Sequence, residues 1–149
     1  MDLLPDVTVT LADGTPLALP SLAGAPAVVY FYPKADTPGC TREAQDFSTL
    51  ADAFAAAGAT VVGVSKDPPA RLAKFAGKHG LTVRLASDES GAASEAFGVW
   101  GEKQLYGRTY MGLERATFLF DADGRLVREW RKVRVPGHAD AVLAAVRTL

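Results

Sequence analysis

The chain has 149 residues, of which 48% are hydrophobic and 22% are charged, and its formal net charge at pH 7 is −1. This length predicts a single domain, residues 1–149, with a core of two or three layers. The near-neutral charge offers no basic surface for nucleic acid or for an anionic membrane. No apolar run is long enough to span a membrane, and residues 1–6 lack the basic start and apolar stretch of a secretory signal.

Cys40 is the only cysteine, so an internal disulfide is impossible and the fold must be stable without one. A chain of this kind is expected in a reducing cytosol, which predicts a cytoplasmic protein. No metal-ligand cluster, phosphate-binding loop, dinucleotide fingerprint or serine triad is visible in the sequence. We therefore expect neither a metal nor a cofactor.

The first elements in chain order predict a hairpin followed by a buried strand. Residues 7–11 alternate with period two, Asp13-Gly14 supplies a turn, and residues 16–19 return, which predicts an N-terminal β-hairpin. Residues 27–32 are continuously apolar, as is typical of a strand covered on both faces. Pro33 ends that strand because proline cannot donate a hydrogen bond to a neighbouring strand.

Thr37-Pro38 predicts the start of a helix, because threonine is favoured at the N-cap and proline at the first helical position. The helix is expected to end at Gly58. Its inner face is one apolar stripe at helical spacing, made of Phe47, Leu50, Ala51 and Phe54.

The middle of the chain predicts further strands and helices in alternation. Residues 59–65 read as a second buried strand, residues 67–80 as a helix, and residues 81–85 as a third, shorter strand. A short helix is then predicted from Ser87 to about Phe97. His79 and the later His138 lie beside glycines near helix ends, and both are interpreted as capping or surface residues.

Residues 98–112 are interrupted by four glycines and predict a long ordered loop, in which Trp100 and Tyr106 are expected to serve packing. Residues 115–120 and 126–131 predict a second hairpin, and residues 137–149 a closing helix. Early βαβ units with a late antiparallel hairpin predict an α/β fold, with a mixed central sheet flanked by helices on both faces.

Cys40 is expected in the first turn of its helix, where unpartnered N–H groups and the helix dipole favour negative charge. The thiolate is the reactive form of cysteine. A lone cysteine is more often an inert buried hydrophobe, and this alternative stays open. The context favours reactivity, because Pro38 and Gly39 leave little bulk beside the sulfur and the loop follows the carboxyl end of a strand, where open α/β sheets bind ligands.

The motif Pro33-x-x-x-Thr37-x-x-Cys40 resembles the peroxidatic signature of peroxiredoxins. Its fuller form, residues 31–41, resembles the bacterioferritin-comigratory (PrxQ-type) branch, and so do residues 98–103 and 115–121. These motifs occur together, in order, over nearly the whole chain. The resemblance implies a thioredoxin-like fold and a thiol-dependent peroxidase that reduces hydrogen peroxide and organic hydroperoxides.

The resemblance also implies roles for individual residues. Cys40 matches the attacking cysteine, which becomes a sulfenic acid. Arg115 matches the arginine that stabilises the thiolate and the peroxide oxygens, although a surface arginine at a strand edge is the alternative. Thr37 matches a threonine whose hydroxyl bonds the sulfur and the substrate, a role that competes with N-capping.

Pro33 matches a proline that shields the thiolate, although a simple strand terminator would look the same in the sequence. Glu43, three residues after Cys40, is expected either to orient Arg115 or only to interact with the helix dipole. Many members of the branch carry a resolving cysteine five residues after the first, where this chain has Gln45.

The single cysteine predicts a one-cysteine enzyme whose sulfenic acid is reduced by an external thiol, such as thioredoxin, glutaredoxin or glutathione. Two alternatives are a peroxide sensor that passes oxidation to a partner and an inert thioredoxin-like binding module. Turnover of peroxide with a supplied thiol separates the enzyme from both. A monomer is expected, because no long apolar edge is visible.

Overall fold

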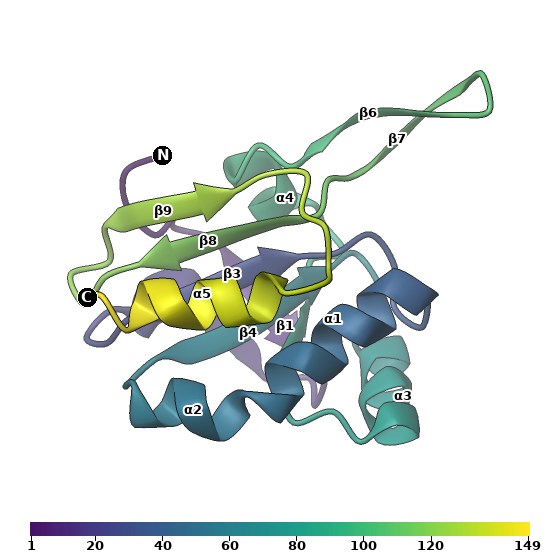
Figure 1. Ribbon diagram of the computed structural model, residues 1–149. Helices are drawn as coiled ribbons and strands as arrows, with labels where there is room; N and C mark the ends of the chain where they lie inside the picture. Colours follow the sequence, from purple (N-terminus) through teal and green to yellow (C-terminus); the bar gives the residue numbers. More distant parts are fainter.

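The computed structural model describes residues 1–149. A seven-stranded mixed sheet in the order β2-β1-β5-β4-β3-β8-β9 runs through the molecule (Figure 1). Strands β3, β4 and β5 are parallel, and their neighbours are antiparallel. The strands are β1 (Thr8–Leu11), β2 (Pro16–Ala18), β3 (Ala27–Phe31), β4 (Thr60–Ser65), β5 (Arg84–Ser87), β8 (Ala116–Phe120) and β9 (Leu126–Trp130). The predicted α/β class is confirmed, and the arrangement is the thioredoxin-like fold.

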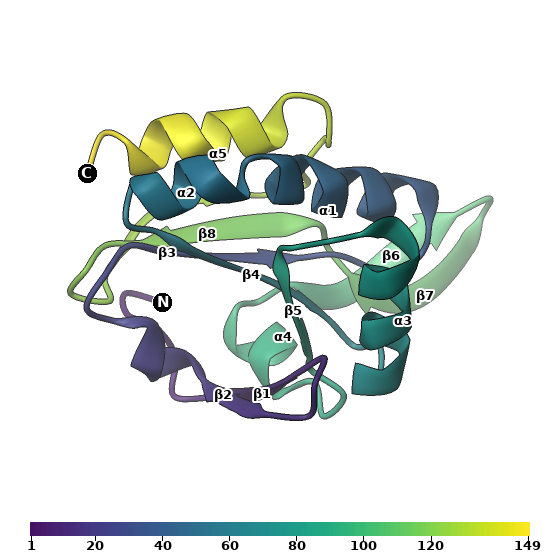
Figure 2. The same ribbon diagram turned by 90° about the horizontal axis from the view of Figure 1, so that it is seen from below.

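Helices cover both faces of the sheet, as predicted (Figure 2). One face packs against α1 (Pro38–Thr49), α2 (Ala51–Ala56), α3 (Pro69–His79) and α5 (His138–Val146). The other face packs against α4 (Ala92–Ala96), the short 3-10 helix η1 (Leu19–Leu22) and the N-terminal segment. The two faces of the sheet thus bury two hydrophobic cores, and strand β3 contributes to both. Val28 and Tyr30 belong to the first core, and Val29 and Phe31 to the second. This explains the unbroken apolar sequence of β3. None of the helices is both long and apolar enough to cross a membrane.

The predicted N-terminal hairpin is present and extends the central sheet. Strand β1 pairs with β2 on one side and with β5 on the other, where Thr10 lies opposite Ser87. The predicted third strand is shifted, because β5 begins at Arg84 and runs to Ser87.

The single helix predicted up to Gly58 is divided at Leu50, whose φ of −93° and ψ of 9° interrupt the helix between α1 and α2. Phe47 and Phe54 are buried on either side of the interruption. Because both face the same core, the apolar periodicity continues across a one-residue break and does not reveal it.

The helix predicted from Ser87 begins later, at Ala92, because Ser87 belongs to β5. Asp88 is buried, and its carboxylate accepts hydrogen bonds from the backbone N–H groups of Ala93 (3.0 Å) and Ser94 (2.8 Å). Asp88 therefore satisfies the free N–H groups at the start of α4, although it lies outside the helix and is separated from it by a turn.

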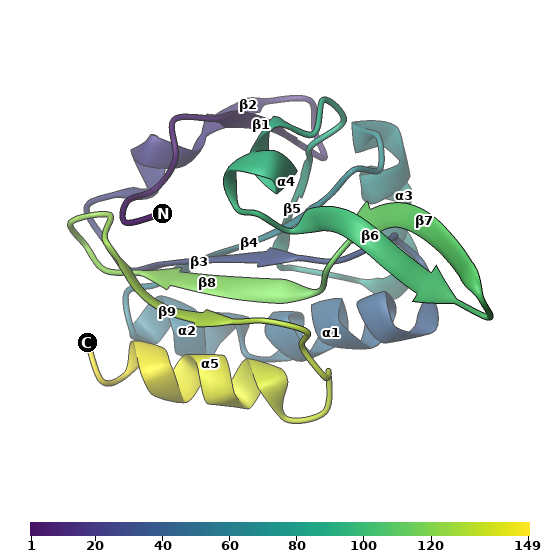
Figure 3. The ribbon, with the colours of Figure 1, turned by 90° about the horizontal axis from the view of Figure 1, so that it is seen from above.

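The prediction of a long loop for residues 98–112 is wrong. These residues form an antiparallel hairpin, β6 (Trp100–Leu105) and β7 (Arg108–Leu113), which projects from the body of the molecule (Figure 3). The turn residues Tyr106 and Gly107 both have positive φ, 50° and 76°, which is the requirement of a type I′ turn. Trp100 packs partly against the second core, as expected, whereas Tyr106 is 96% exposed and packs against nothing.

The interpretation of His138 as a capping or surface residue is also wrong, since its side chain is buried and forms no capping hydrogen bond. Its ring is buried at the start of α5, where Nε2 lies 2.7 Å from Oγ1 of Thr117 on β8. Burial lowers the pKa of His138 to about 4, so this side chain is neutral at pH 7. His79, in contrast, lies half-buried in the last turn of α3.

Candidate active site

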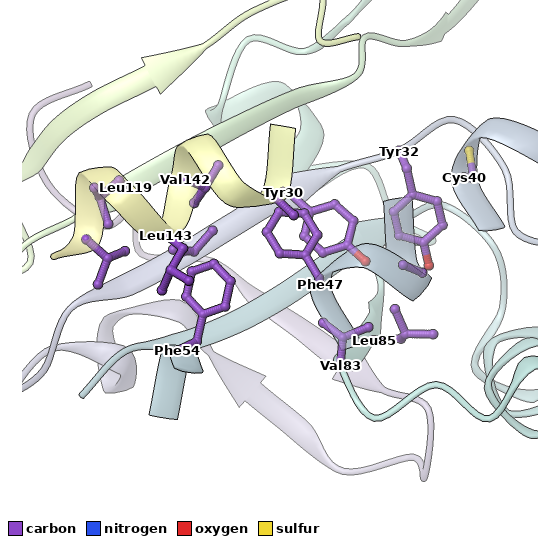
Figure 4. Packing of buried hydrophobic residues seen from close by; sticks show 14 of the residues in the cluster. Tyr30, Tyr32, Cys40, Phe47, Phe54, Val83, Leu85, Leu119, Val142 and Leu143 are labelled. Carbon is purple, nitrogen blue, oxygen red and sulfur yellow. The ribbon is translucent and has the colours of Figure 1, made fainter. Parts of the chain in front are cut away.

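Cys40 lies in the first turn of α1, as predicted, and at the edge of the first core (Figure 4). The side chain is only 2% exposed, and Tyr32 lies beside it on the core side. Pro38 and Gly39 occupy the two preceding helical positions. The sulfur therefore lies at the amino end of a helix, where backbone N–H groups lack intrahelical partners, and it is almost removed from water.

Arg115 connects the sulfur to Glu43. Its Nη2 donates to Sγ of Cys40 at 3.3 Å, and its Nη1 donates to Oε1 of Glu43 at 2.7 Å. The sheet register explains this meeting, because Ala116 at the start of β8 pairs with Phe31 at the end of β3. Arg115 thus precedes one strand at the same edge where the cysteine loop leaves the other.

Gly39 leaves room for the guanidinium. A Cβ atom at this position would lie 3.1 Å from Nη2 of Arg115, closer than side chains ordinarily approach. The absence of a side chain beside Cys40 therefore has a steric function here, which the sequence suggested only as low bulk.

Glu43 is 1% exposed, and only one of its two carboxylate oxygens has a partner. Burial raises the pKa of Glu43 to about 7, against the opposing effect of the Arg115 charge. The contact with Arg115 fits the orienting role expected for Glu43 better than a purely dipolar one.

Thr37 occupies the N-cap position of α1, but its side chain forms no capping hydrogen bond. Its hydroxyl donates instead to the backbone carbonyl of Lys34 at 2.8 Å. The helix start predicted at Thr37-Pro38 is confirmed, whereas the capping hydrogen bond, the alternative to the catalytic role of Thr37, does not form. Pro33 is exposed and is separated from the end of β3 by Tyr32, at the start of the loop that leads to Cys40.

The loop is fastened to α3 and to the turn before α3 by residues that the sequence analysis missed. Asp67 Oδ2 accepts a hydrogen bond from the backbone N–H of Ala35 at 2.8 Å. Asp36 forms an ion pair at 2.8 Å with Lys78 and a hydrogen bond at 2.8 Å with Nε2 of His79, both at the end of α3. The available signal was topological: Asp67 follows β4, the parallel neighbour of β3, so both loops emerge at one edge of the sheet.

Together these contacts place a helix amino end and a permanently charged guanidinium around one sulfur. Such a site stabilises a thiolate and also negative charge that develops on an atom bound next to it.

Comparison with known proteins finds relatives that belong to one family. The model of the AhpC/TSA family matches residues 1–129. The chain is 46% identical to peroxiredoxin Bcp of Xanthomonas campestris pv. campestris, over 95% of this chain and 89% of the relative. It is 42% identical to peroxiredoxin Bcp of Bacillus subtilis, over 97% and 92%.

A solved structure of the Xanthomonas campestris bacterioferritin comigratory protein, studied for its alkyl peroxide reduction activity, superposes with a TM-score of 0.92. The identity is 45%, and the match covers 97% of this chain and 95% of that one.

Proposed function

The chain belongs to the AhpC/TSA family and is a peroxiredoxin, a thiol-dependent peroxidase, and from this we propose that Cys40 alone carries its redox chemistry. The observation that supports this assignment most directly is the 3.3 Å contact from Arg115 Nη2 to Sγ of Cys40. The Cys40 thiolate attacks the distal oxygen of a hydroperoxide and the O–O bond breaks. The alcohol or water leaves after taking up a proton, and Cys40 becomes a sulfenic acid.

Arg115 is proposed to stabilise the charge that moves from the sulfur to the leaving oxygen. Its guanidinium is fixed before the reaction, since Glu43 holds Nη1 while Nη2 faces the sulfur. Preorganised donors of this kind stabilise a transition state without reorientation during the step. Glu43 is thus a positioning residue that acts through Arg115.

Thr37 and Pro33 are proposed to shape the peroxide site. The Thr37 hydroxyl donates its hydrogen bond to the Lys34 carbonyl, so its lone pairs remain available to accept a hydrogen bond from the peroxide O–H. Pro33 begins the same loop and is proposed to limit the access of water to the thiolate.

The absence of a second cysteine determines the reductive half of the proposed cycle. One external thiol condenses with the sulfenic acid to give a mixed disulfide and water. A second thiol then releases the Cys40 thiol and leaves as part of an external disulfide. The alkyl peroxide activity of the Xanthomonas relative supports organic hydroperoxides as substrates beside hydrogen peroxide.

Mass spectrometry of the intact protein tests the one-cysteine mechanism. After one molar equivalent of peroxide, we expect a single added oxygen on Cys40, which an added thiol converts to a mixed disulfide. Excess peroxide should produce the sulfinic acid, because no neighbouring thiol traps the sulfenic form. An unmodified thiol, or an intermolecular Cys40–Cys40 disulfide as the main product, contradicts the proposal. Cys40→Ser is the matched control.

Steady-state turnover identifies the reductant. Rates with glutathione, thioredoxin and dithiothreitol as donors are compared at a fixed peroxide concentration, and turnover with at least one of them is expected. The monomer expected from the sequence is tested in parallel by sedimentation velocity.

A further inference from the structure

The base of the β6–β7 hairpin contains a hollow of about 200 Å³ that the peroxidase chemistry described above does not use. It arises because Gly101 and Gly112 lie opposite each other in the hairpin register and neither contributes a side chain. Glu114 also lines the hollow, and the next residue, Arg115, contacts the Cys40 sulfur. Lys103 also lines the hollow, and the charges of Arg115 and Cys40 act on it, so the hollow lies near the reactive centre.

Lys103 lines this hollow, with its side chain close to Gly112. A Cβ atom at Gly112 would lie 3.0 Å from Cδ of Lys103 and 3.3 Å from the ring of Tyr110, so the missing side chain makes room for the lysine stem. Lys103 is half-buried and forms no ion pair. Burial, together with the nearby Arg115 charge, lowers the pKa of Lys103.

The charges around the hollow favour an anion. Lys132 also lines it and has no ion pair through its side chain. The Glu114 carboxylate is already occupied, because it accepts hydrogen bonds from Arg131 Nε (2.8 Å) and Nη2 (2.9 Å). Glu102 is the one remaining carboxylate, so two lysines face a single uncompensated negative charge.

We infer that this hollow binds the carboxylate of a small thiol reductant, with Lys103 and Lys132 guiding its sulfur to the sulfenic acid of Cys40. The inference rests on the proposed one-cysteine function, which requires an external thiol. The bound thiol attacks the Cys40 sulfur, the S–O bond breaks, and the oxygen leaves as water with the thiol's proton. The second thiol then reduces the mixed disulfide as before.

The lining favours a charged thiol over the tail of an alkyl peroxide. Only two of the nine lining residues, Val99 and Trp100, are hydrophobic, so a hydrocarbon tail would gain little by entering.

The test measures reduction of preformed Cys40 sulfenic acid by mercaptopropionate, mercaptoethanol and cysteamine, which are anionic, neutral and cationic thiols. Each rate is taken as a ratio of variant to wild type, so the intrinsic reactivity of the thiol cancels. Lys103→Gln and, separately, the exposed Lys132→Gln should slow mercaptopropionate about fivefold and leave mercaptoethanol unchanged, as expected for loss of one partly exposed ion pair.

Three further variants sharpen the test. Lys103→Arg should retain the preference for the anionic thiol, and Gly112→Ala should reduce it by displacing the lysine. Lys74→Gln on the exposed face of α3 is the matched control and should behave as wild type. Added propionate should slow only the reduction by mercaptopropionate.

Two results would overturn the inference: an equal loss of rate with all three thiols, or propionate slowing the oxidation of Cys40 by peroxide. The second result would assign the hollow to the peroxide instead. Failure of the underlying one-cysteine function would give a different result from either of these. In that case no sulfenic acid would form on Cys40, or none of the three thiols would reduce it.

Discussion

The two amino groups of the Arg115 guanidinium are in use at the same time, one on the Cys40 sulfur and the other on the Glu43 carboxylate. Only a planar fork reaches both partners in fixed geometry, because an ammonium group is a single point of charge. At the residue scale, the site thus depends on the shape of the cation as well as on its charge.

Arg115→Lys separates these two contributions. The variant keeps the positive charge but loses one of the two contacts, so we expect the rate constant for reaction with hydrogen peroxide to fall by about 10- to 100-fold. Stopped-flow kinetics of Cys40 oxidation measures it. Arg147→Lys, at the exposed end of α5, is the control. A rate equal to that of the wild type would show that charge alone is sufficient.

Glu43 contributes a pH dependence to the stability of the folded protein, and this contribution can be measured by comparing the wild type with Glu43→Gln. Its pKa in the folded protein, raised by burial to about 7, lies above its ordinary value of 4.5. The folded state therefore retains a proton that the unfolded chain releases, and this stabilisation is present at low pH and lost as the pH rises through about 7. The free energy of unfolding of the wild type should fall relative to Glu43→Gln, by up to about 3 kcal/mol between pH 5 and pH 8.

Urea denaturation of both proteins across this pH range measures the difference. The lowered pKa of His138 affects the stability of both proteins equally, so its effect cancels in the difference. A wild type that instead gains stability relative to Glu43→Gln would mean that Arg115 holds the carboxylate ionised in the folded state.

The sequence predicted the contributing residues of this site better than their contacts. Cys40 and Arg115 are 75 positions apart and meet as expected. The fastening of the loop by Asp36 and Asp67 was missed, because polar contacts between distant segments leave no periodicity in the sequence. Capping of the helix was one of two roles expected for the Thr37 hydroxyl. A hydroxyl in a turn has several carbonyls within reach, and here it donates to that of Lys34.

At the scale of elements, the β6–β7 hairpin is the clearest failure of the pattern reasoning. Its glycines suggested a loop, yet Gly101 and Gly112 pair within strands, and only Gly107 lies in the turn. The turn residue before it is Tyr106, whereas asparagine or aspartate is the usual signal at that position. Buried strands such as β3 were predicted correctly because their apolar runs are enforced by two cores.

Tyr106→Asn should stabilise this hairpin. Asparagine tolerates the positive φ of 50° that Tyr106 adopts, and a left-handed residue other than glycine costs about 1 kcal/mol. We expect hydrogen exchange of the β6 and β7 amides to slow by up to about fivefold, with little change in global unfolding, because the hairpin forms its own two-stranded sheet. Gly107→Val should have the opposite effect. Equal exchange in all three proteins would show that the turn does not limit opening of the hairpin.

At the scale of the whole molecule, the sheet joins two separate cores, and the first of them reaches from α5 to the active site. Tyr30 lies at its centre, stacked on Phe47 with ring centroids 4.5 Å apart. Tyr32 continues the same core to Cys40 (Figure 4). The position of the sulfur is therefore coupled to the packing of the entire helical face.

Two glycine substitutions test this packing with opposite signs. Gly63 on β4 lies under the Tyr30 ring, and a Cβ atom there would lie 2.8 Å from Cε1. Tyr30 is fully buried and cannot move aside, so Gly63→Ala should destabilise the protein by about 1–3 kcal/mol. Gly77 lies in the exposed part of α3 with open space around it, so Gly77→Ala should stabilise the protein by about 1 kcal/mol through helix propensity. Thermal and urea unfolding measure both, and a Gly63→Ala protein as stable as wild type would mean that the core around Tyr30 repacks freely.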